Sequence, residues 1–204
     1  MDTLSNNLYY SAKLTGNTFL CSELKTVAYL KHMGLSDTQI KDKVIEENLF
    51  NYKTRKSILK RLGAVLSRIK ALDEPLIEML YSLSSETGKL ITLYSILKTD
   101  RLFFEFMKEV IYEKYRLNQF ELSSLEVGSF FHIKAEQSDI VAKWREVTMR
   151  KLAQVYLKIL IQAGLLKKNR TFTIIPQIIP QELSTYLKNS PENDYIHLLL
   201  GDKF

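Results

Sequence analysis

The chain has 204 residues, 46% of them hydrophobic, and 29 Lys plus Arg outnumber 23 Asp plus Glu to give a net charge of +6. This length suits one large domain or two small ones. No stretch approaches the roughly 18 apolar residues that a membrane span needs, and no signal peptide is visible. A single cysteine, Cys21, excludes an internal disulfide. We therefore expect a cytoplasmic protein without membrane insertion.

The first part of the chain has apolar residues at helical spacing. Ser36 and Gln39 form a capping-box signature, and Gly34 just before them ends the preceding helix. Thr99 or Asp100 is placed to cap a later one. The pattern predicts a bundle of helices over residues 23–33, from 36 to about 49, 54–71, 74–84, 86–97 and onward from about 100.

The second part begins at Asn118 and Gln119, the best candidate boundary. Ser123 and Glu126 form a second capping box, which predicts a helix over 125–135. A long helix over 147–163 ends at Gly164, and the β-prone residues 171–175 follow a basic turn. Short helices are expected to begin at Pro180 and Pro191.

This order of elements predicts a mainly α protein with two parts. Residues 1–118 form an N-terminal helical bundle, and residues 119–204 form a C-terminal winged-helix-like lobe with a small β-wing. The bundle is expected to pack against the lobe, because no Pro/Gly-rich linker separates the two. In a winged helix-turn-helix, a helix and a β-wing together hold a duplex.

Positive charge is concentrated in two segments, and the rest of the chain is net negative. Residues 51–70 contain seven basic residues and no acid, while residues 143–170 contain eight basic residues and only Glu146 as an acid. Such a charge distribution creates an electric field that draws phosphates to the positive segments and repels them elsewhere. The candidate nucleic-acid-binding residues are Lys53, Lys56, Lys60, Arg61, Arg68, Lys143, Arg145, Arg150, Lys151, Lys167, Lys168 and Arg170.

Helical spacing also predicts where these cations point. Lys56, Lys60, Arg61 and Arg68 fall mainly opposite the apolar stripe that runs from residue 58 to 69, so we expect them to be exposed. Lys167, Lys168 and Arg170 are expected on the turn of the wing. The alternative is that both runs are ordinary solvated helix faces.

Catalytic motifs are missing from the sequence. His32, His132 and His197 have no ligand spacing, and the chain contains no HExxH, CxxC or Gly-rich phosphate loop. The adjacent acids Glu46 and Glu47 point about 100° apart on a helix. We therefore expect a protein that is not an enzyme and has no cofactor or metal site.

Several short residue patterns in this chain are similar to those of one known protein family. The similar features at the start are Tyr10–Leu14, Ser22-Glu23-Leu24, Gly34-Leu35-Ser36, Glu47-Asn48-Leu49-Phe50 and the basic helix ending at Arg68. Similar features later are LKTDRLFFEFMKEVIYEKY and WREVTMRKLAQVYLKILIQAGLL. These features resemble the BrxA family, small proteins of bacterial BREX phage-defence systems. The resemblance implies a non-enzymatic protein with a NusB-like helical lobe, a winged-helix-like lobe and double-stranded DNA binding.

Together these observations predict a double-stranded DNA-binding component of a phage-defence complex that works with other BREX proteins. Lys and Arg give affinity through phosphates without sequence choice. Two alternatives remain open: an RNA-binding NusB-like protein, with Tyr52 as its only stacking candidate, and an adaptor whose basic patches meet acidic proteins. A helix-turn-helix over 29–49 is disfavoured, because its second helix is acidic.

Overall fold

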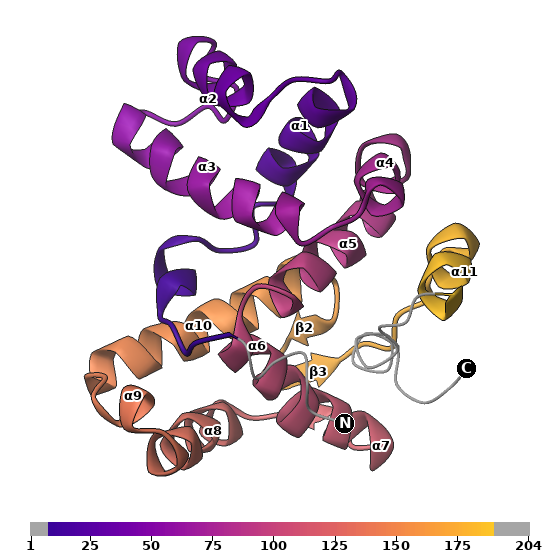
Figure 1. Ribbon diagram of the computed structural model, residues 1–204. Helices are drawn as coiled ribbons and strands as arrows, with labels where there is room; N and C mark the ends of the chain where they lie inside the picture. Colours follow the sequence, from indigo (N-terminus) through magenta and orange to yellow (C-terminus); the bar gives the residue numbers. More distant parts are fainter. Residues whose placement is uncertain (1–7, 190–204) are drawn as a thin grey trace. The chain divides into compact units, whose positions relative to one another are not determined.

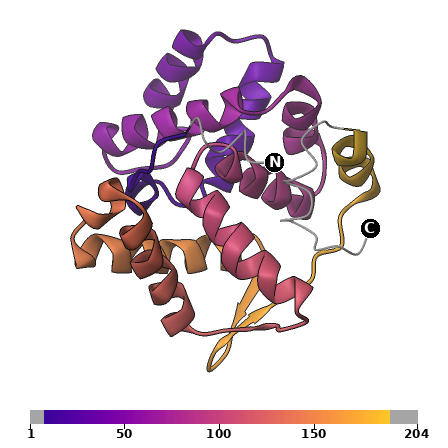
Figure 2. The same ribbon diagram turned by 60° about the horizontal axis from the view of Figure 1, so that its bottom comes forward.

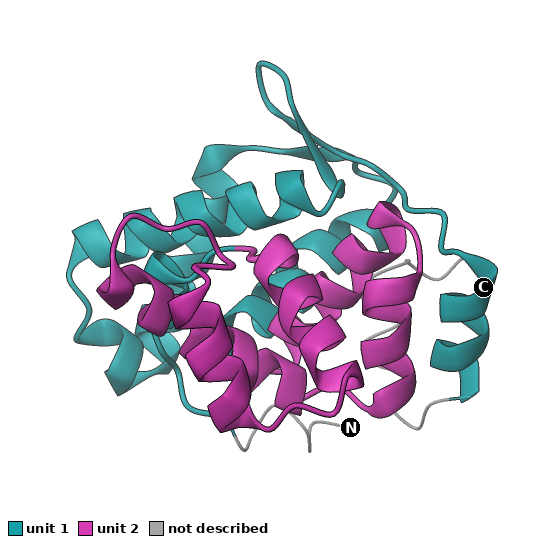
Figure 3. Ribbon diagram, turned by 90° about the horizontal axis from the view of Figure 1, so that it is seen from above, with its two compact units in different colours: residues 1–18, 100–204 teal, residues 19–99 magenta. Residues whose placement is uncertain are grey.

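The structure is a computed structural model that describes residues 8–189 of the chain. It is mainly helical and contains a small three-stranded antiparallel sheet, which confirms the predicted fold class (Figure 1). The chain divides into two compact units (Figure 3): unit 1 comprises residues 1–18 and 100–204, and unit 2 comprises residues 19–99. No helix in the described range is long and apolar enough to cross a membrane.

Unit 2 is a bundle of helices, most of which begin at a polar cap. The Ser36 side chain accepts from the Gln39 amide and the Gln39 side chain accepts from the Ser36 amide, so the predicted capping box is present. Thr54, Asp73 and Ser84 cap three further helices. The helices are α1 (Cys21–His32), α2 (Asp37–Glu46), α3 (Arg55–Lys70), α4 (Glu74–Ser82) and α5 (Ser85–Leu97).

Helix α5 is buried along almost its whole length and contacts α1, α3 and α4. Two polar side chains on its buried surface bond within the helix. Thr92 Oγ1 donates to the Gly88 carbonyl at 2.7 Å and Ser95 Oγ donates to the Thr92 carbonyl at 2.7 Å. Because both hydroxyls are paired, their burial avoids the cost of an unsatisfied polar group.

Unit 1 contains all the strands and the longest helix of the described range. It begins with a 3-10 turn, η2 (Lys13–Gly16), and resumes with a helix whose middle is a π-helical segment, η3. Its elements after residue 100 are α6 (Arg101–Phe106), η3 (Met107–Tyr112), α7 (Glu113–Arg116), β1 (Glu121–Leu122), α8 (Ser124–Gln137), α9 (Asp139–Ala142), α10 (Glu146–Gln162), β2 (Leu166–Lys168), β3 (Phe172–Ile174) and α11 (Gln181–Asn189).

Most of these boundaries follow the predicted signals. The Asp100 side chain caps α6, Ser123 and Glu126 form the predicted capping box of α8, and Gly164 ends α10 with a φ of +86°. Only glycine adopts such a φ without steric cost. The helix expected to start at Pro191 lies outside the described residues.

The sheet has the strand order β1-β3-β2, with both neighbouring pairs antiparallel. β2 and β3 form a hairpin whose register pairs Lys167 with Thr173 and Lys168 with Phe172. β1 was not predicted, because two residues carry no periodicity. It joins the segment before α8 to β3, the second strand of the hairpin.

An aromatic cluster around Tyr156 of α10 fills the core of unit 1. The ring of Tyr156 lies 4.9 Å from Phe103, 5.3 Å from Phe106 and 5.4 Å from Phe131, measured between centroids. Tyr156 is fully buried. These contacts attach α6 and α8 to α10.

The same cluster explains why the chain divides elsewhere than at the predicted position. The predicted boundary between residues 118 and 119 falls inside unit 1. Phe103 and Phe106 belong to the segment that was assigned to the N-terminal part, yet their rings pack on α8 and α10. Helical spacing within residues 100–116 predicted that these side chains face inward. It did not indicate which part of the protein they pack against.

A buried ionic cluster lies beside this aromatic core. Glu105 accepts from Lys134 Nζ at 2.8 Å and from Arg101 Nε at 2.8 Å, and the Tyr10 hydroxyl lies 3.0 Å from both of its oxygens. Burial raises the pKa of Glu105, but the bonds from Lys134, Arg101 and Tyr10 outweigh burial and hold that pKa below its ordinary value. The cluster connects α6, α8 and residue 10.

This pKa shift predicts how stability depends on pH. A lowered pKa in the folded state contributes stability above the unfolded value of 4.5, and the contribution is lost as pH falls through the folded value. The free energy of unfolding should therefore be higher for the wild type than for Glu105→Gln at pH 7. We expect this difference to shrink below pH 4.5 in urea unfolding curves. A difference that does not change with pH would contradict the assigned charge state.

Candidate nucleic-acid interface

Helix α10 divides its side chains between the core and the solvent. Leu152, Val155, Tyr156, Ile159 and Leu160 are buried. Successive residues of a helix lie about 100° apart around its axis, so a second group of side chains falls on the opposite side of α10. That exposed row comprises Arg150, Lys151, Gln154 and Lys158. A single element thus anchors the core of unit 1 and presents cations to solvent.

The amino end of α10 adds two further cations. Lys143 and Arg145 are exposed in the turn between α9 and α10, and Arg145 is the N-cap residue without a side-chain capping bond. The amides at a helix start point outward and favour anions. Glu146 is the one acid on α10, and it lies 3.5 Å from Arg150 in an ion pair that is about 70% exposed, a geometry that contributes little stability.

The hairpin of β2 and β3 carries the third group of cations in unit 1, and it projects from the helices (Figure 2). Lys167, Lys168 and Arg170 are all exposed. Only Arg170 lies on the connecting turn at residues 169–171, because Lys167 and Lys168 belong to β2. The turn is held by the Asn169 amide, which donates to the Thr171 carbonyl at 2.8 Å.

The basic helix α3 belongs to unit 2, and its cations differ in exposure more than was predicted. Lys53, Lys56 and Lys60 are exposed and have no ion pair among the described residues. The Arg61 guanidinium instead lies 4.1 Å from the centroid of the Tyr52 ring. Burial and the hydrogen bond to Glu23 raise the pKa of Tyr52 to about 12, so this phenol is neutral and available as a face for Arg61.

Arg68 is not a surface residue, and its predicted exposure was wrong. Its side chain is only 3% exposed, and Nη1 donates to the Phe19 carbonyl at 2.6 Å. Arg68 follows Arg61 by two turns, so both lie on the side of α3 between the apolar stripe and the row of Lys56 and Lys60. The next residue after Phe19, Leu20, has a left-handed φ of 56°, a conformation that is costly for a side chain with a Cβ.

The twelve predicted residues are divided between the two units. Seven belong to unit 1 and four of the five in unit 2 reach solvent at least in part. Two exposed residues of α10, Gln154 and Lys158, were not among the candidates. Their signal was present in the sequence, because they follow Arg150 and Lys151 at helical spacing. Within residues 8–189, no group of three His, Cys, Asp or Glu is placed to hold a metal ion.

Comparison with known proteins assigns this chain to a protein family. The BrxA family model matches residues 9–190. The chain belongs to the BrxA family. A BREX protein BrxA from Bacillus cereus is 35% identical over 194 residues, which is 95% of this chain and 97% of the relative. A BREX protein BrxA from Paramagnetospirillum magneticum is 18% identical over 190 residues, or 93% and 96% of the two chains.

A solved structure shares the fold of this BrxA family member. The crystal structure of an uncharacterized protein from Magnetospirillum magneticum matches with a TM-score of 0.79 at 21% identity. The match covers 94% of this chain and 98% of the other. It therefore includes both units.

The burial of Arg68 generates a direct prediction about stability. Arg68→Met leaves the Phe19 carbonyl without this donor, so the free energy of unfolding should fall by about 1–3 kcal/mol. Lys60→Met, at an exposed position of the same helix, should change it by less than about 0.5 kcal/mol. Both values are measured by urea unfolding. Equal stability of the two variants would mean that Arg68 is a surface residue after all.

Proposed function

We propose that the protein is a non-enzymatic, double-stranded DNA-binding component of a bacterial phage-defence system of the BREX type. Its two curated relatives carry the name BREX protein BrxA, which supports the assignment to that system. The DNA-binding part rests on one observation: the exposed row of α10 and the adjoining hairpin carry many cations and a single acid, Glu146. Other BREX proteins are the expected protein partners.

The order of elements in unit 1 supports a winged-helix interpretation. Strand β1 precedes α8, α9 and α10, and the β2–β3 hairpin follows. The central position of β3 in the order β1-β3-β2 is typical of a winged helix-turn-helix. In such a domain the later helix enters the major groove and the hairpin lies against the backbone. On this interpretation α10 is the recognition helix, and unit 2 is the NusB-like bundle.

The chemistry of the exposed side chains favours phosphate contacts over base recognition. Lys143, Arg145, Lys151, Lys167 and Lys168 are exposed and have no ion pair among the described residues, so phosphates need not displace a carboxylate to reach them. Neutralising phosphates releases counterions and gives affinity without sequence choice. Arg150 and Gln154 are the side chains of α10 suited to guanine and adenine edges. We therefore propose binding with weak sequence preference.

The two alternatives make different predictions for the same purified protein. RNA recognition favours unstacked bases on aromatic platforms, whereas the Tyr52 ring is covered on one face by Arg61. An adaptor that meets only acidic proteins gives no nucleic-acid shift at moderate salt. Competition between duplex DNA and single-stranded RNA for a labelled duplex separates the three functions.

The first test of DNA binding is its salt dependence. The logarithm of the binding constant should fall linearly with the logarithm of salt concentration, with a slope near −0.9 for each phosphate neutralised. Lys167→Ala with Lys168→Ala should weaken binding and make that slope shallower by up to about 2, while leaving thermal stability nearly unchanged, because both side chains are exposed. Salt-independent binding, or cleavage of the DNA when Mg²⁺ is added, would reject the proposal.

A matched variant in unit 2 tests the second basic patch. Lys56→Ala with Lys60→Ala also removes two exposed charges. We expect a comparable loss of slope if one duplex contacts both units. An unchanged slope in the same salt titration would assign Lys56 and Lys60 to a protein partner and limit the DNA-binding surface to unit 1.

A further inference from the structure

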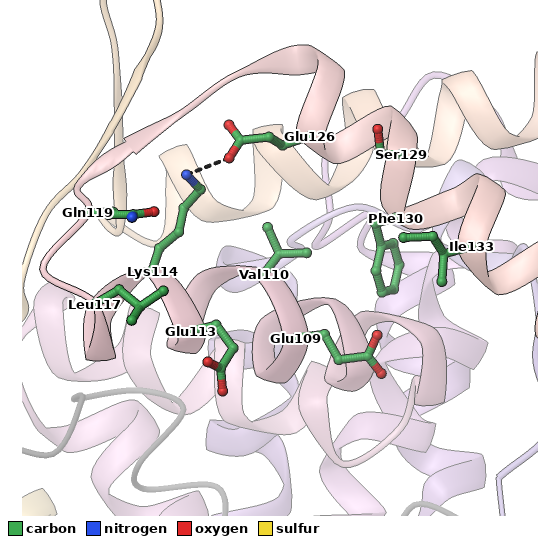
Figure 4. Close-up of a pocket in the computed structure, with 10 residues that line it drawn as sticks. All are labelled: Glu109, Val110, Glu113, Lys114, Leu117, Gln119, Glu126, Ser129, Phe130 and Ile133. Carbon is green, nitrogen blue, oxygen red and sulfur yellow. Dashed lines mark ion pairs between the residues drawn. The ribbon is translucent and has the colours of Figure 1, made fainter.

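A groove on unit 1 lies between α8 and the helical segment formed by η3 and α7 (Figure 4). Its volume is about 330 Å³, within the range of roughly 300–1,000 Å³ that is usual for binding pockets. Apolar side chains from both walls line it, namely Val110, Leu117, Phe130 and Ile133. Leu117 is 57% exposed and Ile133 is 48% exposed, so the lining is open to a partner.

Carboxylates surround this apolar lining. Glu109 and Glu113 lie on one wall and Glu126 on the other. Each of these side chains is between 42% and 45% exposed. The cations that pair with two of them lie deeper, because Lys134 is 5% exposed and Lys114 is 13% exposed. Arg116, which pairs with Glu113, is 57% exposed but does not line the groove. The charge on the groove lining is therefore mainly negative.

In two of these carboxylates, one oxygen is open to a hydrogen-bond donor from another molecule. Glu109 Oε1 accepts from Lys134 at 2.5 Å and Glu113 Oε2 accepts from Arg116 at 2.8 Å. The other oxygen of each has no donor among the described residues. The two residues are four positions apart, where like charges repel, and Figure 4 shows both carboxylates on the same side of their helix. A cation from another molecule would relieve this repulsion.

The backbone around the groove is unusual in two places. Glu109 and Val110 belong to the π-helical segment Met107–Tyr112, and π-turns within α-helices are rare and frequent at functional sites. At the other end, Asn118 has a left-handed φ of 53° and reverses the chain after Leu117. Lys114 Nζ bonds Glu126 Oε1 at 2.6 Å across the groove and fixes the spacing of its two walls.

We propose that this groove docks a segment of a partner protein that presents an apolar side chain flanked by Lys or Arg. The apolar lining takes the apolar side chain, and Glu109 and Glu113 take the cations. DNA does not fit, because phosphates are repelled by the same carboxylates. Helix α8 separates the groove from α10, since Glu126 and Ile133 face the groove whereas Val127 and Phe131 lie on the α10 side. The docking and DNA surfaces are therefore independent.

The test uses the full chain, labelled with ¹⁵N, and two synthetic helical peptides. One peptide is composed of Leu and Lys, and its control has Glu in place of each Lys. We expect the Leu/Lys peptide to shift amide resonances around Val110, Leu117 and Ile133, while the Leu/Glu peptide does not. Perturbations that cluster elsewhere, equal binding of the two peptides, or no binding would overturn the proposal.

A pair of charge reversals locates the interaction. Glu113→Lys should weaken binding of the Leu/Lys peptide at least tenfold. The variant is expected to fold, because within residues 8–189 the Glu113 side chain bonds only to Arg116, in an exposed pair. Glu78→Lys, an exposed reversal in unit 2, should change the affinity less than twofold. Equal losses in both variants would show non-specific attraction and overturn the proposal. Self-association of the chain that Glu113→Lys abolishes would also overturn it, because a second copy would then occupy the groove.

Discussion

The burial of α10 against the aromatic side chains of α6 and α8 is the contact on which unit 1 depends. Tyr156 touches Phe103, Phe106 and Phe131, so one helix joins elements that are far apart in the chain. Once that side is buried, the helical period leaves a single row of residues for solvent. Because the row carries Arg150, Lys151 and Lys158, packing itself decides which cations of α10 reach solvent.

Buried cations and unpaired exposed cations of this protein differ in their partners. Lys134 and Arg68 are buried and bond carboxylates or a backbone carbonyl; removing one of them leaves its partners unsatisfied. Lys151 and Lys167 are exposed without an ion pair among the described residues. Positive charge along the sequence does not distinguish these classes. The partner atoms do, and they are supplied by segments far away in the chain.

Local signals predicted much of the fold. The capping boxes at Ser36 and Ser123, the cap at Asp100 and the glycine after α10 act within one turn, so the sequence specifies them directly. The family resemblance and the helical class were likewise visible in the residues. Strand β3 lies within the β-prone residues predicted after Gly164, whereas Lys167 and Lys168, expected on the turn, belong to β2.

Long-range packing explains what the sequence could not predict. Arg68 lies beside the exposed row of α3, and only the path of residue 19 reveals that it is covered. β1 has two residues, and its pairing with β3 joins segments about fifty positions apart. The acidic groove likewise combines Glu109 and Ile133 from two helices. Neither residue stands out in the sequence, because each is ordinary until the fold places them opposite each other.

We propose that DNA runs along the exposed row of α10. Site-specific photocrosslinking tests it most directly, with p-benzoylphenylalanine placed at Gln154 of that row and, as a matched control, at Ile133 in the acidic groove, in the presence of a labelled duplex. Our account predicts a protein–DNA crosslink from position 154 that competitor duplex removes, and none from position 133. Absence of a crosslink at 154, or equal crosslinking from both positions, would contradict it.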